Sequence, residues 1–202
     1  GNAYFTISII GIIIIGLLIT LSTIVFQGQY VNLLCHSAQM KSFVTQYFYY
    51  YALGIVFECY MVSVAYFIKT DGFIGMQFRA FLICNVVNII FDVIFMKLMN
   101  LGIVGAAMAT TVGHVISAVY ITLYFFKSNR TLRLIKVKTS QILVYLVDIC
   151  KSGFAGSSIP LYTTIRLIVL NALIFGLLGN LGLAAYDMCY NALYLVDIFI
   201  LG

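Results

Sequence analysis

The chain has 202 residues, of which 63% are hydrophobic and only 8% are charged, and its mean hydropathy is +1.10. A water-soluble domain carries about 25% charged residues, so this composition excludes one. The net charge of +5 does not indicate a nucleic-acid partner, because the positive residues concentrate between apolar runs and no recognition motif is present. We find no nucleophile–base pair, metal spacing or nucleotide motif, so we expect no enzyme and no bound cofactor.

Apolar runs follow one another along the whole chain. A helix of about 20 apolar residues crosses the roughly 30 Å of hydrocarbon in a bilayer. These runs predict an all-α polytopic membrane protein with six spans. The predicted spans are residues 4–26, 44–68, 79–99, 103–127, 156–178 and 182–202. The chain lacks an initiator Met and stops in an apolar run, so we interpret it as a fragment of a longer protein.

The Lys and Arg residues concentrate on one side of the predicted membrane. Most of them follow the second span (Lys69 and Arg79) or the fourth span (Lys127, Arg130, Arg133, Lys136, Lys138 and Lys151). The positive-inside rule therefore predicts that residues 69–79 and 127–151 are cytoplasmic in a multi-pass protein of the plasma (inner) membrane.

The second basic segment also predicts a domain boundary. Residues 128–140 are basic and polar, whereas 141–151 are apolar but too short to span, so we expect a short interfacial helix there. The predicted linker, residues 128–155, separates part of one lobe with four spans (1–127) from the start of a second lobe with two spans (156–202).

Asn88 and Asp92 lie four residues apart inside the third span. Four residues is about one helical turn, so the two side chains share a face, which Asn85 extends. A carboxylate inside a membrane helix costs several kcal/mol and is usually functional. The turn 100–102 predicts an antiparallel hairpin with the fourth span, and counting from that turn places Thr110 and Asp92 at the same depth.

These three side chains offer oxygen atoms, which are the ligands that small hard cations prefer. The sequence thus predicts a coupling site at Asp92, Asn88 and Thr110 that takes Na⁺ or, on the carboxylate, a proton. The small residues Gly105, Ala109 and Gly113 predict close packing of the fourth span against a neighbour.

Other polar residues lie inside the apolar runs. Glu58 either faces a substrate cavity or is protonated and bonded to a Tyr or Ser of a neighbouring helix. Arg166 and Asp197 lie at comparable depths and are expected to form an ion pair, with substrate contact as the alternative for Arg166. The candidate cavity residues are Glu58, Asn85, Asn171, Asp187 and Asn191.

Several short sequence motifs in the chain resemble those of the multidrug and toxic compound extrusion (MATE) family. Residues 67–133 resemble its first half, and residues 151–186 resemble the start of its second half. The motifs are Phe67-Ile-Lys-Thr-Asp-Gly72, Asn88-Ile-Ile-Phe-Asp-Val-Ile-Phe95, Gly102-Ile-Val-Gly-Ala-Ala-Met-Ala-Thr110, Lys151-Ser-Gly153, Leu170-Asn171 and Leu183-Ala-Ala-Tyr186. The resemblance implies that the chain corresponds to the third through eighth of twelve helices in two six-helix lobes.

The resemblance implies a secondary active exporter that exchanges cationic or amphipathic compounds for Na⁺ or H⁺ by alternating access. Many members bind the cation with an Asn-x-x-x-Asp pair, which matches Asn88 and Asp92, with a Thr that matches Thr110, and with an upstream aspartate on the first helix. Some members use a glutamate on the seventh helix, where this chain has no acid. The expected partners are the lipid bilayer and small cationic substrates, and we expect a monomer when full length.

A lipid-linked saccharide flippase of the same superfamily is the alternative function. Arg166 favours it, because basic cavity residues meet the anionic pyrophosphate of such substrates. The acidic residues within the spans favour cationic cargo instead; they are Glu58, Asp92, Asp187 and Asp197. We expect the fragment alone not to transport.

Overall fold

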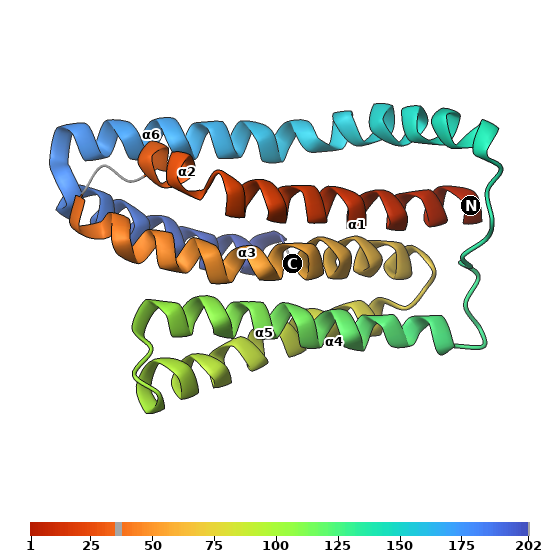
Figure 1. Cartoon of the computed structure of the whole chain (residues 1–202), viewed down its shortest axis with the longest axis horizontal. Helices are drawn as coiled ribbons and strands as arrows, with labels where there is room; N and C mark the ends of the chain where they lie inside the picture. Colours follow the sequence, from red (N-terminus) through yellow and green to blue (C-terminus); the bar gives the residue numbers. More distant parts are fainter. Residues whose placement is uncertain (35–37, 202) are drawn as a thin grey trace. The chain divides into compact units, whose positions relative to one another are not determined.

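A computed structural model of the chain describes residues 1–34 and 38–201, with side chains described except at 33–34, 38–40, 155, 180 and 191–201. Within these residues the structure is all-α, as predicted. The helices are α1 (Asn2–Val25), α2 (Gln27–Leu34), α3 (Ala38–Thr70), α4 (Ile74–Asp92), the π-helix η1 (Val93–Leu98), α5 (Gly102–Thr122), the 3₁₀ helix η2 (Leu123–Phe126) and α6 (Thr139–Leu201) (Figure 1). The chain divides into two units, Gly1–Val147 and Asp148–Gly202.

Five helical segments in the described part of the chain are long and apolar enough to cross a membrane. They are Asn2–Val25, Lys41–Thr70, Ile74–Leu98, Gly102–Phe126 and Gly156–Gly179. The first five predicted spans are therefore helical, with bounds that differ from the prediction by a few residues. The sixth predicted span, 182–202, stays a prediction: its backbone is helical to Leu201, but its side chains from 191 onward lie outside the described residues.

The long helix α6 contains a break where the sequence predicts a turn. Gly179 has φ +64° and ψ −161°, outside the helical region and readily reached only by glycine. This residue begins the predicted turn 179–181. The polypeptide therefore changes direction between the fifth predicted span and the residues that follow.

Two local predictions differ from the structure. The predicted loop 27–43 is largely helical, because α2 and the start of α3 occupy it; Lys41 Nζ donates to Asn32 Oδ1 at 2.8 Å between them. The predicted short helix 141–151 is helical but does not end there, because α6 begins at Thr139 and continues through Pro160. Both predictions rest on hydropathy, which measures polarity and not helix formation.

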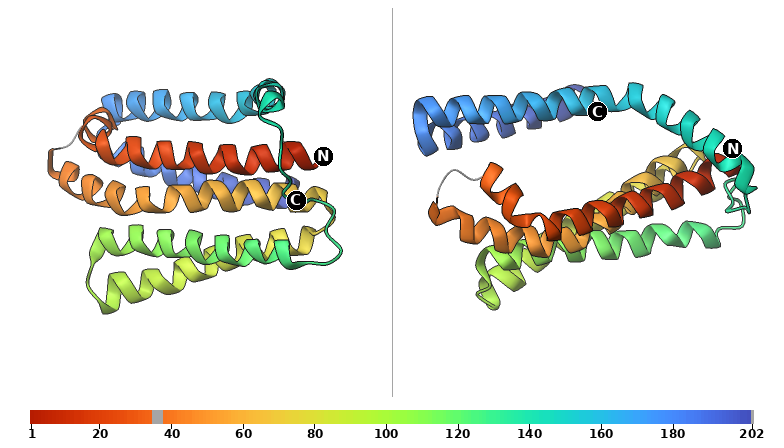
Figure 2. Two further views of the ribbon diagram at one scale, coloured as in Figure 1. Left: turned by 45° about the vertical axis from the view of Figure 1, so that its right-hand side comes forward. Right: turned by 45° about the horizontal axis from the view of Figure 1, so that its top comes forward.

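In the first unit α3 lies between α1 and α5, and α4 packs against α5 and α3 (Figures 1 and 2). Side chains from all four helices form a buried core at the end of the unit that contains Asn2, the α3–α4 turn and η2. The central members are Phe5, Ile9, Met61, Val64, Ile68, Met76, Ile121 and Tyr124. On the outer faces, large apolar side chains such as Leu18, Phe78 and Val119 remain 60–65% exposed, which suits helices solvated by lipid.

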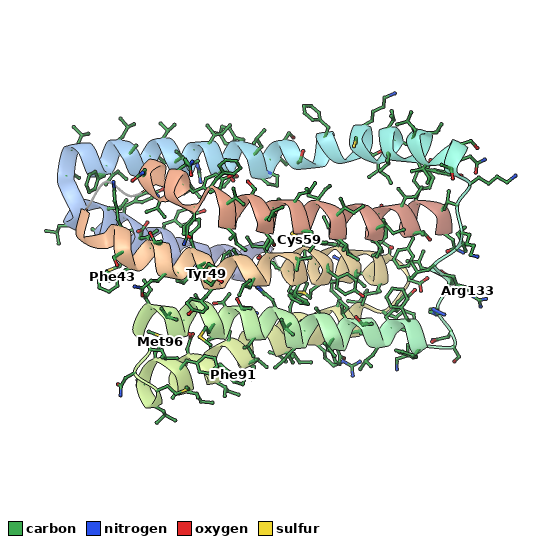
Figure 3. All side chains as sticks on the ribbon, viewed as in Figure 1. Phe43, Tyr49, Cys59, Phe91, Met96 and Arg133 are labelled. Atoms are coloured by element: carbon green, nitrogen blue, oxygen red, sulfur yellow. The ribbon has the colours of Figure 1, made fainter. Side chains whose placement is uncertain are left out.

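Small residues let these helices approach closely. A Cβ on Gly16 of α1 would lie 3.2 Å from Val56 Cα, near Cys59 of α3 (Figure 3). A Cβ on Gly54 of α3 would lie 2.9 Å from Thr111 Oγ1 of α5. Because lipid supplies no hydrophobic drive between membrane helices, such close backbone packing is a main source of their association.

The linker between α5 and α6, residues 127–138, is fixed to the first unit by hydrogen bonds. The Thr131 amide donates to Asp71 Oδ2 at 3.0 Å, and the hydroxyls of Thr131 and Tyr124 also donate to the Asp71 carboxylate. The Arg133 amide donates to Asn2 Oδ1 at 3.1 Å (Figure 3). The linker therefore runs across the ends of α3 and α1.

Candidate functional site

The hairpin formed by α4, η1 and α5 carries the predicted coupling residues. Its turn requires left-handed backbone at Asn100 (φ 54°) and Gly102 (φ 53°). A Cβ on Gly105 would lie 2.9 Å from the Phe95 carbonyl carbon, and one on Gly113 would lie 2.8 Å from the Cys84 carbonyl oxygen. These contacts confirm the predicted close packing, with α5 as one partner and α4–η1 as the other.

A hydrogen bond joins the two helices inside the span. Asn88 Nδ2 donates to Thr110 Oγ1 at 3.0 Å, and Thr110 Oγ1 itself donates to the Ala106 carbonyl at 3.0 Å. Thr110 thus bonds back to its own helix and still accepts from α4. An amide that donates through its nitrogen keeps its carbonyl oxygen as an acceptor or cation ligand.

Counting from the turn predicts that Thr110 and Asp92 lie at one depth. The hydrogen bond that Thr110 makes across the hairpin is with Asn88, which lies one turn from Asp92 along α4. The π-helix η1 directly follows Asp92. Its i→i+5 hydrogen bonds fit more residues into a turn than an α-helix does, and such segments are frequent at functional sites.

Asp92 itself is half-buried, and its Oδ1 atom is fully buried with no hydrogen-bond partner. Burying an ionised carboxylate without a partner is strongly unfavourable. A proton on this oxygen, or a cation beside it, would remove the penalty. The nearby oxygens of Asn88 and Thr110 fit a small hard cation.

Asn85 does not join this group. Its side chain is exposed, and Nδ2 donates to the Phe81 carbonyl of its own helix at 2.8 Å. The predicted polar stripe along α4 therefore keeps Asn88 and Asp92 as candidate ligands, whereas Asn85 makes its hydrogen bond within its own helix.

A second polar group lies between α3 and α5. Tyr51 donates its hydroxyl to Glu58 Oε2 at 2.9 Å, and His114 Nδ1 lies 4.0 Å from the same oxygen. Thr111 Oγ1 donates to the Tyr50 carbonyl at 2.9 Å and ties the two helices together. The Glu58 side chain is 37% exposed, whereas that of His114 is 11% exposed. Glu58 is thus bonded to a tyrosine of its own helix, within reach of a histidine one turn from Thr110.

The candidate residues of the second unit lie along α6. Asn171 Oδ1 is buried without a hydrogen-bond partner, whereas Arg166 and Asp187 are exposed. The side chains of Asn191 and Asp197 lie outside the described residues. The ion pair of Arg166 with Asp197 and the cavity role of these residues therefore stay predictions.

The sequence reasoning missed Asp71 as a structural centre. Desolvation raises the pKa of its carboxyl, but the hydrogen bonds from Thr131 and Tyr124 outweigh this effect and lower the pKa below its ordinary value. Asp71 lies in the motif Phe67–Gly72 that resembles the family, and this resemblance is the one sequence feature that could have indicated its importance. The partners of Asp71, Tyr124 and Thr131, lie 53 and 60 residues away in sequence, so no local pattern predicts them.

Known proteins resemble this chain along nearly all of its length. A multidrug export protein MepA from Staphylococcus saprophyticus is 26% identical over 197 residues, and one from Staphylococcus haemolyticus is 24% identical over 199. Each alignment covers 96% of this chain but 43% of the relative, so the chain spans less than half the length of these curated relatives. No family model matches the chain.

A solved structure has the same fold. It is described as the inward-facing conformation of a multidrug resistance MATE family transporter of the MOP superfamily. The TM-score is 0.82 at 20% identity, over 94% of this chain and 43% of that one. The predicted fold class and the predicted resemblance are therefore confirmed.

Proposed function

We propose that the protein carrying this chain is a secondary active multidrug exporter, on the premise that its relatives and its fold are those of the multidrug and toxic compound extrusion family. It exchanges cationic or amphipathic compounds for Na⁺ or H⁺. The protein acts as a monomer in the plasma membrane, with residues 69–79 and 127–151 in the cytoplasm. It needs no cofactor beyond the coupling ion and binds no nucleic acid.

The observation that carries this proposal is the buried, unpartnered Oδ1 of Asp92 beside the hydrogen-bonded pair of Asn88 and Thr110. A proton binds the Asp92 carboxylate directly. Na⁺ instead takes carboxylate, amide and hydroxyl oxygens, and an upstream aspartate, implied by the family resemblance, completes its coordination.

Transport requires the ion and the cargo to favour different lobe arrangements. The ion binds the arrangement in which Asn88, Asp92 and Thr110 converge, and cargo binds the other with higher affinity. Each ligand then shifts the equilibrium by its difference in affinity for the two states, which is the thermodynamic content of coupling.

The test is Asp92→Asn in the full-length protein. The variant keeps the size of the side chain but neither binds a proton at pH 7 nor supplies a negative charge. We expect it to insert normally and to lose efflux driven by an imposed Na⁺ or proton gradient, whereas Asp92→Glu keeps part of the activity. Measurements of dye efflux from cells with matched protein levels decide the question; unchanged efflux by Asp92→Asn contradicts the proposal.

A further inference from the structure

An apolar groove lies between α1 and the segment that joins α5 to α6. It encloses about 510 Å³. Ile7, Ile10 and Ile14 of α1 form one wall, and Ile142 and Leu146 of α6 form much of the other. All of these residues belong to the first unit. A volume of this size is typical of a site for a small molecule.

The groove is built by specific contacts on both walls. The Ile135 amide donates to Thr6 Oγ1 at 3.0 Å, and this hydrogen bond holds the linker against α1 at one end of the groove. The rings of Tyr4 and Tyr145 meet edge to face with centroids 4.8 Å apart, which holds the start of α6 beside α1. The bonds to Asp71 and Asn2 fix the preceding linker residues.

The charge at the groove is positive. Lys136 lines it among aliphatic side chains. The linker 127–138 carries five basic residues and no Asp or Glu; they are Lys127, Arg130, Arg133, Lys136 and Lys138. A cationic export substrate is repelled here, whereas an amphipathic anion is attracted through both its apolar part and its charge.

The length of the groove matches one membrane leaflet. From Thr6 to Ile14 the α1 wall rises about 12 Å, against about 15 Å for half of the hydrocarbon core. Lys136 belongs to none of the candidate spans, and its neighbour Ile135 bonds to Thr6 in the first turns of α1. If α1 crosses the membrane, its end lies near the lipid phosphates, and Lys136 lies beside that end. An acyl chain along the isoleucines would place its headgroup beside this ammonium.

We propose that this groove binds an anionic phospholipid of the leaflet that faces the linker, with one acyl chain against Ile7, Ile10 and Ile14 and the phosphate paired with Lys136. The lipid bridges the first helix of the unit and the linker that leads to the second unit. The inference requires that α1 crosses the membrane, and it does not depend on the identity of the cargo or of the coupling ion.

The headgroup is tested with purified full-length protein in a neutral detergent, to which phosphatidylglycerol or phosphatidylcholine is added. We expect phosphatidylglycerol to be retained in native mass spectra and to raise the thermal unfolding midpoint more than phosphatidylcholine does. Lys136→Gln should weaken the apparent affinity for phosphatidylglycerol about fivefold, the effect of one basic residue at an anionic lipid surface. Lys127→Gln removes the same charge outside the groove and should change it much less.

The acyl-chain position is tested with Gly11→Leu. A Cβ at Gly11 meets no atom within 4 Å, so the new side chain projects into the groove without disturbing the packing. We expect it to reduce retention of phosphatidylglycerol, whereas Gly28→Leu, also in open space on α2, does not. The proposal is overturned if the two lipids stabilise the protein equally, or if Lys127→Gln and Lys136→Gln have the same affinity for phosphatidylglycerol. It is also overturned if the Gly11→Leu variant retains the lipid fully, which is the result expected when another part of the protein covers the groove.

Discussion

Asn88 and Thr110 show how one side-chain contact organises the candidate site. The 3.0 Å bond between them crosses from α4 to α5 within the predicted spans and joins two half-buried side chains. It holds the amide one turn from the unpartnered Oδ1 of Asp92. The geometry of the site thus depends on how closely the two helix backbones approach, and Gly113 controls that approach.

Gly113→Ala should separate the two helices. Its Cβ would lie 2.8 Å from the Cys84 carbonyl oxygen, closer than real Cβ atoms come to backbone, and 3.6 Å from Asn88 Cβ. Overpacking of this kind typically costs about 1–3 kcal/mol. We expect a lower thermal unfolding midpoint in detergent and weaker ion binding by the full-length protein.

Gly75→Ala is the matched control for Gly113→Ala. Its Cβ meets only the Arg79 guanidinium at 3.6 Å, an ordinary contact with a flexible side chain. Because alanine is the better helix former, this variant should be neutral or slightly stabilising. If the two alanine variants unfold alike, close packing at Gly113 does not limit the stability of the hairpin.

The linker 127–138 is an ordered element although it is not helical. Its amides at Thr131, Arg133 and Ile135 donate to side chains of Asp71, Asn2 and Thr6 in turn. Alternate residues of an extended segment point the same way, so the three amides face the unit together. This arrangement places Lys136 beside α1 and fixes where α6 begins.

Acid should loosen the linker through Asp71. The pKa of its carboxyl is lowered in the folded protein, so its contribution to stability is complete above the unfolded pKa of about 4 and is lost as the pH falls through the lower folded value. We expect hydrogen exchange at residues 131–135, corrected for intrinsic rates, to rise below about pH 4.

Asp71→Ala should reproduce that loosening at neutral pH. The variant removes the acceptor of the Thr131 amide and of the Tyr124 hydroxyl. A loss of about 1 kcal/mol corresponds to roughly fivefold faster trypsin cleavage at the linker's basic residues. Asp187→Ala removes an exposed carboxylate from α6 and serves as the control; equal cleavage of both variants contradicts the anchoring role.

For the whole protein, the proposed function predicts the sign of the cargo from the acidic groups inside the spans. Glu58 and Asp92 lie at least six residues from the ends of the spans of the first unit, whereas the Lys and Arg residues of those spans lie within five residues of an end. Arg166 is the one basic residue of the span Gly156–Gly179. Acidic groups in a low-dielectric site attract cations and repel anions, so we expect cationic compounds in preference to the anionic pyrophosphates of a flippase.

Expression of the full-length protein in cells that lack their own exporters should lower the accumulation of a lipophilic cationic dye several-fold. An anionic dye of similar size serves as the control and should accumulate unchanged. If the protein instead restores a strain defective in cell-envelope polysaccharide and leaves the cationic dye unaffected, the flippase function replaces the exporter.

The spans, the turns at Asn100–Gly102 and Gly179, and the shared face of Asn88 and Asp92 follow from local sequence. Hydropathy, helical period and glycine conformation depend on neighbours within a few residues. The small residues Gly105 and Gly113 also predicted a close helix contact, since no larger side chain allows it. For that reason the fold class and the hairpin could be predicted before the structure.

Other features depend on contacts between distant residues. The hydrogen bond between Asn88 and Thr110 joins residues 22 apart in sequence, and the π-helix η1 after Asp92 is not revealed by composition. The anchoring of Thr131 by Asp71 joins residues 60 apart. The groove at Lys136 exists only where α1 and α6 are brought together. Such pairings are selected by packing and hydrogen bonding of the assembled helices, so only the fold shows that Thr110 is the hydrogen-bond partner of Asn88.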